Sequence, residues 1–438
     1  MKIEDYLKRS ATLYPNKIAV ITDAEQCTYA ELYQRTYLRA SELSETSDKR
    51  IIVFRASQTI DFLVEYFAIH LAGCVAVPLE KDIPEDRFLF VSQLFKVATV
   101  PDNIADVLFT TGTTGIPKGV MISHEAIIAN AENLIDAQQF SHDLIFIITG
   151  PLSHIGSLSK VYPIIIQGAT LYLTKGMKDI NQFFHALDHP TQKMATFLVP
   201  SAIRMLLILS ADRLAKYAKK IVFIETGAAP IAQSEMQLLR KLLPHSSLYN
   251  TYASTETGIV CTQDFNTGMY DAGCVGLPMR HASIEISDQG MIICKGKMIM
   301  SGYINDITAP KKVLCNGRIH TSDLGWLDEH GQLHLAGRKD DIINVGGFKV
   351  SPTEVENVAL SLPEIVDCIC ISVPHSLLGN HLKLLVVLHT GKVLDKKRLA
   401  QFLKSKLESF KVPMLYQQVD NIKKTSNGKT DRKYYNTP

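Results

Sequence analysis

The chain has 438 residues, of which 46% are hydrophobic and 21% charged, and its formal net charge at pH 7 is +2. Because a single hydrophobic core rarely extends beyond roughly 250–300 residues, this length predicts two or more domains. The composition is that of a soluble globular protein. The small net charge argues against an acidic tail and against a nucleic-acid-binding surface.

The cysteines and the apolar segments indicate the compartment. Eight cysteines are scattered through mostly apolar segments, without a Cys-x-x-Cys pair or a nearby histidine pair at metal-binding spacing. They are expected to be small buried residues in a reducing compartment. The amphipathic N-terminus lacks the apolar core of a signal peptide, and the most apolar segment, Asp143–Ile166, is interrupted before it could span a bilayer. We therefore expect a cytoplasmic protein without a membrane span.

Short β-branched runs alternate with helical patterns through the first half of the chain. The expected strands are Ile51–Phe54, Val75–Leu79, Leu144–Thr149, Thr170–Thr174, Thr196–Val199 and Ile221–Glu225. The expected helices are Thr59–Ala72, His124–Gln138, Ile180–Leu187, Ser201–Leu209 and Ala232–Leu243. This alternation predicts parallel sheet with helices packed on its faces.

The pattern changes after about Tyr270 to short strands and turns. Two apolar runs flank a hairpin turn signal at Asp328–Gly331, so the segment as far as Ala336 is expected to form a β-rich lobe. A compact α+β pattern then follows, with strands at IINV, FKV, CICISV and LKLLVVL and helices from Ser351 and over Lys396–Glu408. The domain boundary is predicted in GRKDD, where a glycine and a run of charges interrupt the apolar pattern.

The segment TTGTTGIPKG, from Thr110 to Gly119, follows the apolar run ADVLF. Glycines let backbone N–H groups converge on an anion, while hydroxyls and a lysine add charge-assisted hydrogen bonds, so this composition favours phosphate binding. The spacing does not match the G-x-x-x-x-G-K-[ST] pattern, because Pro117 stands where the second glycine would be. On composition alone, a flexible surface turn is an equally good interpretation.

TTGTTGIPKG resembles the phosphate-loop signature of the adenylate-forming superfamily, which includes acyl- and aryl-CoA synthetases, firefly luciferase and the adenylation domains of nonribosomal peptide synthetases. Other signatures of that superfamily recur in the same order, namely CTYAEL, AGCVAVPLEKDIPEDR, TGAAP, TYASTETG, GMIICKGKMIMSGY, HTSDLGWLD, GRKDDIINVGGFKVSPTEVE and KKTSNGKTDR. The resemblance covers nearly the whole chain. It implies an α/β and α+β multidomain fold, with a large N-terminal adenylation domain of helix-covered sheets and a β-rich lobe at 1–337, a hinge at 338–341 and a small mobile α+β C-terminal domain at 342–438.

The resemblance also implies which residues bind ATP. Glu256 would help to bind the magnesium ion that bridges the phosphates, and Thr255 would hydrogen-bond a phosphate oxygen. Tyr252 would lie against the adenine ring, Asp323 would accept hydrogen bonds from the ribose hydroxyls, and Arg338 would assist at ribose or phosphate. The residues implied to contact ATP or AMP are Thr110, Thr111, Gly112, Thr113, Thr114, Lys118, Gly227, Ala228, Ala229, Pro230, Tyr252, Asp323 and Arg338.

The C-terminal motifs imply the remaining catalytic parts. Lys429, inside SNGKTDR, matches the lysine that bridges the attacking carboxylate and the α-phosphate and neutralises charge in the transition state. Asp340 matches the hinge residue about which the C-terminal domain rotates between the two half-reactions. Gly346, Gly347 and Phe348 would then line a tunnel for the thiol arm of the cosubstrate.

The acid pocket is implied by two motifs. PLSHIGSL carries His154 where CoA ligases of the superfamily often have a histidine or an aromatic residue, and it lacks the aspartate that amino-acid-activating domains use to hold an ammonium group. Ala253 replaces a frequent glycine beside the pocket, and Ser254 follows it. We therefore expect His154, Ala253 and Ser254 to contact an acid without an α-amino group.

The implied reaction consists of two steps. A carboxylate attacks the α-phosphorus of ATP to give an acyl adenylate and pyrophosphate, and a thiol then attacks the activated carbonyl. GGFKVSPTEVE resembles the form of this motif in free-standing acyl- and aryl-CoA ligases, which favours coenzyme A as acceptor over the alternative, the phosphopantetheine of an acyl carrier protein. A noncatalytic adenylate-binding protein is the alternative from another class. The acid can be aryl, aliphatic or similar to o-succinylbenzoate.

Overall fold

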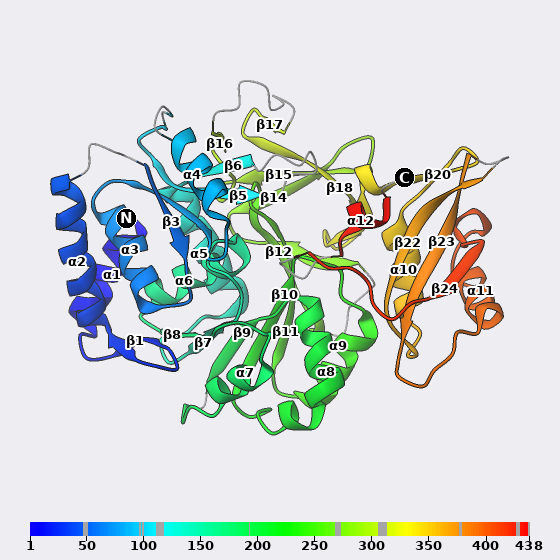
Figure 1. Cartoon of the computed structure of the whole chain (residues 1–438), viewed down its shortest axis with the longest axis horizontal. Coiled ribbons are helices and arrows are strands. Elements are labelled where there is room, and N and C mark those ends of the chain that lie inside the picture. The colour runs from blue at the N-terminus through cyan, green and yellow to red at the C-terminus, as the bar shows by residue number, and fades with distance from the viewer. Residues whose placement is uncertain are drawn as a thin grey trace.

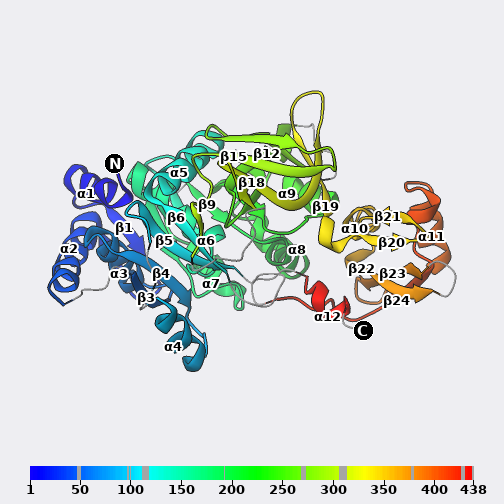
Figure 2. The same ribbon diagram turned by 90° about the horizontal axis from the view of Figure 1, so that it is seen from above.

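The computed structural model describes residues 1–46, 51–95, 98, 100–110, 118–191, 193–267, 273–304, 313–375, 379–425 and 430–436. Figures 1 and 2 show an elongated molecule with its first helices at one end and its C-terminal elements at the other. Within the described residues, no helix is long and apolar enough to cross a membrane.

A five-stranded sheet lies near the N-terminal end, with strand order β16-β6-β5-β4-β3. Strands β3, β4 and β5 are parallel, whereas β6 pairs antiparallel with both β5 and β16. The strands are β3 (Ile51–Ala56), β4 (Val75–Glu80), β5 (Ile104–Thr110), β6 (Lys118–Ser123) and β16 (Gly302–Tyr303). The helices of this region are α1 (Ile3–Leu13), α2 (Tyr29–Thr46), α3 (Ile60–Leu71) and α4 (Glu85–Leu94).

A second, larger sheet forms the centre of the molecule. Its parallel strands β10, β9, β7, β8 and β1 lie side by side, and β11 extends it parallel to β10. The strands are β1 (Ile18–Ile21), β2 (Gln26–Thr28), β7 (Ile145–Ile148), β8 (Thr170–Leu173), β9 (Met194–Phe197), β10 (Ile221–Gly227), β11 (Ser247–Ser254) and β12 (Gly258–Asp264).

Helices cover both faces of this sheet. One core contains Phe146 and Phe223 with the buried sides of α5 (His124–Gln138) and α6 (Ile155–Gln167). The other contains Ile147 and Ile224 with α7 (Ile180–Leu187), α8 (Pro200–Ala215) and α9 (Gln233–Leu242). Neighbouring residues of one strand thus enter opposite cores, which explains why these strands are apolar throughout.

The β-rich lobe continues the large sheet, because β13 pairs antiparallel with β12 on one side and with β19 on the other. Its hairpin from β18 to β19 turns at the predicted residues. The strands are β13 (Cys274–Pro278), β14 (Ala282–Ile286), β15 (Met291–Gly296), β17 (Leu314–Cys315), β18 (Arg318–Leu327) and β19 (Leu333–Arg338), and a 3-10 turn, η1, covers Phe265–Thr267.

The C-terminal elements have a three-stranded sheet, β22-β23-β24, and an apolar core of their own. A 3-10 turn, η2 (Lys339–Asp341), connects β19 to them. The elements are β20 (Ile343–Val345), β21 (Phe348–Val350), α10 (Pro352–Leu360), β22 (Ile365–His375), β23 (Gly379–Leu388), α11 (Lys396–Lys404), η3 (Ser409–Lys411), β24 (Leu415–Gln418) and α12 (Arg432–Asn436). The expected fold class is thereby confirmed.

One glycine at the connection packs closely against the C-terminal part. Gly337, with φ at +122°, lies at the end of β19, and a Cβ atom built on it would be 2.3 Å from Ser351 Oγ at the start of α10. Only glycine adopts this backbone conformation readily.

The expectation for the cysteines is wrong at one position. Six of the eight are buried and Cys74 is half-buried, but Cys315 is exposed. Cys315 lies in the two-residue strand β17, which pairs only with β18 at the margin of the lobe, so no second layer covers it.

Candidate active site

The two ends of the phosphate-loop segment are held together by β-pairing. Thr110, the last residue of β5, pairs antiparallel with Lys118, the first residue of β6. The other predicted loop residues, Thr111, Gly112, Thr113 and Thr114, lie outside the described residues. Lys118 Nζ lies 5.2 Å from the centre of the Tyr303 ring, so the ammonium group contacts an aromatic face at the base of the loop.

Glu256 contacts the hydroxyl of the same tyrosine. It occupies the half-buried turn between β11 and β12, and the Tyr303 hydroxyl donates to its Oε1 at 3.1 Å. Tyr303 therefore brings the predicted phosphate-binding lysine and the predicted metal-binding carboxylate to one place. Sequence reasoning gave Tyr303 no role, although it ends the quoted motif GMIICKGKMIMSGY.

The donor set at this point fits a magnesium ion bound through phosphate. No group of three or more His, Cys, Asp or Glu side chains that could hold a metal occurs within the described ranges. Glu256 supplies one hard oxygen ligand, and Mg²⁺ is commonly held by one or two carboxylates together with phosphate oxygens and water.

The turn that carries Glu256 is fixed by its neighbours. The hydroxyls of Ser254 and Thr257 lie 3.0 Å apart, and Thr257 Oγ1 accepts a hydrogen bond from the Ser254 backbone N–H. Gly258 has φ at +66°, and a Cβ atom there would lie 2.4 Å from the Met298 carbonyl oxygen. Thr255 and Glu256 are both half-buried within this turn.

A second cluster joins three residues predicted to contact adenosine. Tyr252 donates from its hydroxyl to Asp323 Oδ2 at 2.7 Å, and Arg338 Nε lies 3.1 Å from Asp323 Oδ1. Asp323 and Arg338 are paired residues of β18 and β19, whereas Tyr252 comes from β11. Burial and the Asp323 carboxylate raise the pKa of Tyr252 well above its usual value, so the hydroxyl stays protonated as a donor.

Replacement of Asp323 by alanine is expected to raise KM for ATP by about 10- to 100-fold, because charge-assisted hydrogen bonds to the ribose would be lost. Pyrophosphate release measured over a range of ATP concentrations checks this. Asp288→Ala, which changes an exposed aspartate in the turn before β15, is the control. An unaltered KM for ATP in Asp323→Ala would contradict the assignment.

The turn at Gly227–Pro230 lies beside Tyr252. Gly227, the last residue of β10, pairs in parallel with Thr251 of β11, and a Cβ atom on it would be 2.6 Å from the Thr251 carbonyl oxygen. Ala228 has φ at +67°, a conformation uncommon for residues with a side chain, and Ala229 and Pro230 complete the turn. The carboxyl ends of two parallel strands therefore meet here, at an edge where α/β proteins often bind ligands.

The predicted acid-pocket residues come from two elements. Ala253 and Ser254 are half-buried at the end of β11. His154 is the N-cap residue of α6, and its Nε2 lies 3.0 Å from Glu80 Oε1 at the end of β4. The hydrogen bond with His154 lowers the pKa of Glu80, so the carboxylate stays ionised and holds the imidazole in place.

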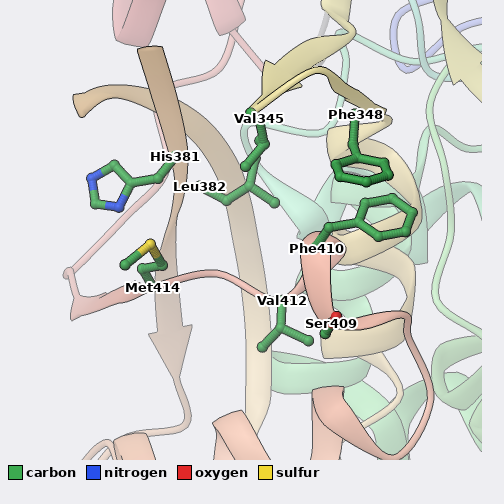
Figure 3. A pocket seen from close by; sticks show the side chains of 9 residues that line it. Val345, Phe348, His381, Leu382, Ser409, Phe410, Val412 and Met414 are labelled. Carbon is green, nitrogen blue, oxygen red and sulfur yellow. The ribbon is translucent and has the colours of Figure 1, made fainter. Parts of the chain in front are cut away.

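Two of the three predicted thiol-tunnel residues, Gly346 and Phe348, line a cavity in the C-terminal part. Gly346 and Gly347, with φ at +56° and +91°, form the turn between β20 and β21. Phe348 stacks on Phe410 with ring centres 4.6 Å apart, and Figure 3 shows both rings beside the other side chains of an apolar cavity of about 200 Å³. The cavity is lined by Val345, Gly346, Phe348, His381, Leu382, Ser409, Phe410, Val412 and Met414. Asp340 is exposed in η2.

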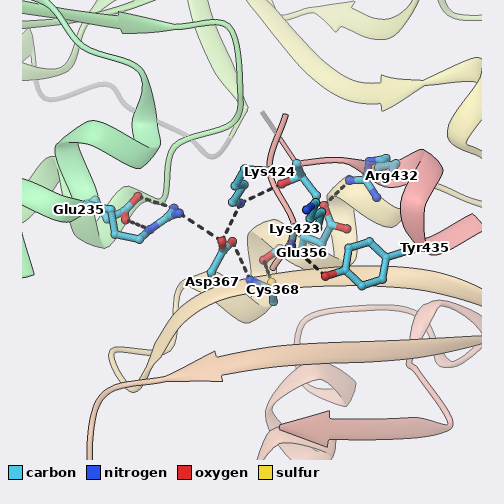
Figure 4. A network of polar contacts seen from close by, with 10 residues as sticks. Glu235, Glu356, Asp367, Cys368, Lys423, Lys424, Arg432 and Tyr435 are labelled. Carbon is cyan, nitrogen blue, oxygen red and sulfur yellow. Dashed lines mark hydrogen bonds and ion pairs between the residues drawn. The ribbon is translucent and has the colours of Figure 1, made fainter. Parts of the chain in front are cut away.

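Lys429 lies outside the described residues, but the residues that flank it are anchored. Lys424 and Thr430 form a β-bridge, and Lys424 Nζ donates to Thr430 Oγ1 at 3.0 Å. Lys424 Nζ is also 2.6 Å from Asp367 Oδ2 of β22. Figure 4 shows Asp367 between Lys424 and the side of the molecule that carries Glu235.

Asp367 also connects the two parts of the chain. Its Oδ2 lies 3.6 Å from Arg204 Nη1 of α8, and Arg204 is bound in turn by Glu235 of α9 at 2.5 Å. Asp367, Arg204 and Glu235 are each less than 15% exposed, so solvent screens this contact only partly.

Replacement of Asp367 by alanine is expected to loosen this contact and to speed tryptic cleavage next to exposed Arg338 and Lys339 by about 5- to 30-fold. The measurement is limited proteolysis followed by mass spectrometry, with Asp420→Ala, an exposed carboxylate of the same part, as control. Cleavage of Asp367→Ala at the wild-type rate would contradict the prediction.

Several ligases and solved structures resemble this chain along nearly its whole length. It is 24% identical to a putative long chain fatty acid-CoA ligase, VraA, of Staphylococcus epidermidis, over 99% of this chain and 97% of that protein. It is also 24% identical to the 2-succinylbenzoate–CoA ligase of the same species, over 98% and 96% of the two chains. The fold matches ATP-bound MatB from Rhodopseudomonas palustris with a TM-score of 0.86 at 22% identity, covering 99% of this chain and 98% of that one.

The family models cover both parts of the fold. The model of the AMP-binding enzyme matches residues 7–100 and 92–304, and the model of the AMP-binding enzyme C-terminal domain matches residues 354–429. These ranges include Tyr303 with Lys118 and Glu256, and also Tyr252 and Lys429, whereas Asp323 and Arg338 lie between the two matches. The chain therefore belongs to the family of AMP-binding enzymes, within the adenylate-forming superfamily that its motifs resemble.

Proposed function

We propose that this protein is an AMP-forming acid–CoA ligase that converts a carboxylic acid to an acyl adenylate and then to its coenzyme A thioester. The observation that supports this best is the contact of Tyr303 with both Lys118 and Glu256. It joins a cation for the phosphates and a carboxylate for the metal beside the paired residues that flank the phosphate-loop segment. The Tyr252–Asp323–Arg338 cluster supplies the polar groups for adenosine.

In the first half-reaction the acid carboxylate attacks the α-phosphorus and pyrophosphate leaves. Lys118 holds the leaving phosphates, while Tyr252 and Asp323 fix the adenosine, so the two reactants meet in line. A magnesium ion, when bound beside Glu256, supplies positive charge to the phosphate oxygens. Lys429 reaches the reacting oxygens from the C-terminal domain and neutralises the charge that develops there.

In the second half-reaction the thiol of coenzyme A attacks the acyl carbonyl and AMP leaves. We infer that the domain after residue 341 rotates about Asp340, which is exposed in the short turn between β19 and β20. Gly346 and Gly347 have no side chain to obstruct a pantetheine arm, and Phe348 gives it an apolar wall. Since all eight cysteines are free thiols, we propose that the reaction takes place in the cytoplasm.

The test is pyrophosphate release from purified protein with ATP, Mg²⁺ and a panel of aryl, fatty and dicarboxylic acids. We expect one group of acids to give pyrophosphate and AMP, and a thioester to form when coenzyme A is added. A thioester formed with a carrier-protein phosphopantetheine but not with coenzyme A would replace the proposed acceptor. Absence of pyrophosphate with every acid would overturn the proposed function.

A further inference from the structure

An ion pair is buried next to the predicted acid pocket. Lys160 Nζ of α6 donates to Glu225 Oε1 of β10 at 2.8 Å, and both side chains are only 1% exposed. Lys160 Nζ also lies 5.2 Å from the centre of the Phe197 ring. Burial lowers the pKa of Lys160, and the carboxylate of Glu225 opposes this effect. Removing two charges from water is costly, so such a pair is weak evidence for a purely stabilising role.

One atom of the pair has no partner. Glu225 Oε2 is buried without a hydrogen bond from any of the described residues. Nearly all buried polar atoms of native proteins are hydrogen-bonded, because an unpaired acceptor pays its desolvation without compensation. The pair therefore presents one open acceptor, next to an ammonium group that has further N–H donors.

The pair lies on the same two elements as His154 of the predicted acid pocket and Gly227 of the predicted adenosine turn. Lys160 follows His154 by six positions along α6, which places it about 9 Å further along the helix axis at 1.5 Å per residue. Glu225 precedes Gly227 by two positions on the same face of β10, about 7 Å from the carboxyl end of the strand. The Phe197 ring lies between the ion pair and the starts of α6 and of the adenosine turn. It is 5.2 Å from Lys160 Nζ, and Cβ atoms built on Gly156 and Gly227 would lie 3.4 and 3.8 Å from it.

We propose that Glu225 and Lys160 form the far wall of the acid pocket and select an acid that carries a hydroxyl group at the end remote from its carboxylate. The hydroxyl donates to Glu225 Oε2 and accepts from Lys160 Nζ. Because the pair is neutral as a whole, a charged group at this depth would lack compensation, and an apolar end would leave Oε2 unpaired. This inference rests on the proposed acid activation and names the substrate class for it.

The test compares acids that differ only in this hydroxyl. Suitable pairs are 3-(4-hydroxyphenyl)propanoate with 3-phenylpropanoate, and ω-hydroxyoctanoate with octanoate, each assayed by pyrophosphate release. We expect kcat/KM of wild-type protein to be about 10- to 100-fold higher for the hydroxylated member of at least one pair. Equal values, or a preference for the unhydroxylated member in both pairs, would overturn the inference but leave the proposed function standing. Absence of pyrophosphate with every acid would overturn both.

Variants separate recognition from stability. In the double variant Lys160→Leu/Glu225→Leu, the ratio of kcat/KM between hydroxylated and unhydroxylated acid should fall to about one or below, since apolar replacements of similar size are tolerated in place of a buried pair. Lys193→Leu/Asp143→Leu removes an exposed ion pair of 2.6 Å and should keep the wild-type ratio. Lys160→Met/Glu225→Met serves if the double leucine variant does not fold, because the flexible methionine side chains fill the same space without a strong hydrogen-bonding group, and it should also lose the preference. A ratio that persists in the folded variant would overturn the inference.

Discussion

Replacing Glu256 by alanine is expected to lower the rate of acyl-adenylate formation by about 100- to 1,000-fold, the usual effect of removing one group that stabilises transition-state charge. Glu256 accepts from the Tyr303 hydroxyl at 3.1 Å, and Tyr303 also contacts Lys118. The variant thus loses the proposed metal ligand and leaves the tyrosine hydroxyl without this acceptor. ATP–pyrophosphate exchange at saturating ATP and a range of Mg²⁺ concentrations measures the loss.

Two control variants test whether the loss of rate is specific to the Glu256 carboxylate. Glu329→Ala changes a glutamate that is 88% exposed and should leave exchange at the wild-type rate. Tyr303→Phe removes only the hydroxyl and keeps the ring that faces Lys118, so it should lower the rate by about tenfold or less. A rate within threefold of wild type for Glu256→Ala would show that the metal is held elsewhere.

Replacing Lys429 by alanine is expected to slow the first half-reaction by about 1,000-fold or more while the second half-reaction proceeds. The proposed role of Lys429 is confined to the charge that develops on attack at phosphorus, so thiol transfer from a preformed adenylate does not need it. The measurement supplies a synthetic acyl adenylate with coenzyme A in one assay, and ATP with free acid in the other.

Lys404→Ala is the matched control for this split, because Lys404 is an exposed lysine at the end of α11 in the same domain. It should leave both assays unchanged. Equal loss of both half-reactions in Lys429→Ala would indicate a general disturbance of the domain and contradict the assigned role. Full activity in both assays would show that another group neutralises the charge of the first half-reaction.

The sequence predicted most of the regular elements because their signals are local. The periodic patterns for α5 and α7 give the observed bounds, His124–Gln138 and Ile180–Leu187, since one face of each helix enters a core. Helix α6 was not predicted. Gly150-Pro151 and Pro163 interrupt its pattern, yet Pro163 lies inside the helix, where burial of its neighbours offsets a lost backbone hydrogen bond.

The sequence predicted residues of the candidate site only where a recognisable motif contains them. Tyr252, Glu256 and Asp323 follow from their signatures, but their contacts join segments far apart in the chain. Tyr303 reaches Glu256 across 47 positions, and Lys160 reaches Glu225 across 65. A lysine in an apolar helix and a glutamate in an apolar strand give no local signal that they will meet, because tertiary packing alone brings them together.

At Gly337, the type of residue determines how closely the end of β19 packs on the start of α10. Its φ of +122° is strained for any residue with a side chain, and a Cβ atom there would lie 2.3 Å from Ser351 Oγ, so the serine hydroxyl would have to turn away. Any larger side chain at position 337 would strain the packing between the end of β19 and the start of α10. A methyl group at this one site would therefore strain the connection seen in Figures 1 and 2, and under the proposed rotation about Asp340 it would favour other orientations of the C-terminal domain.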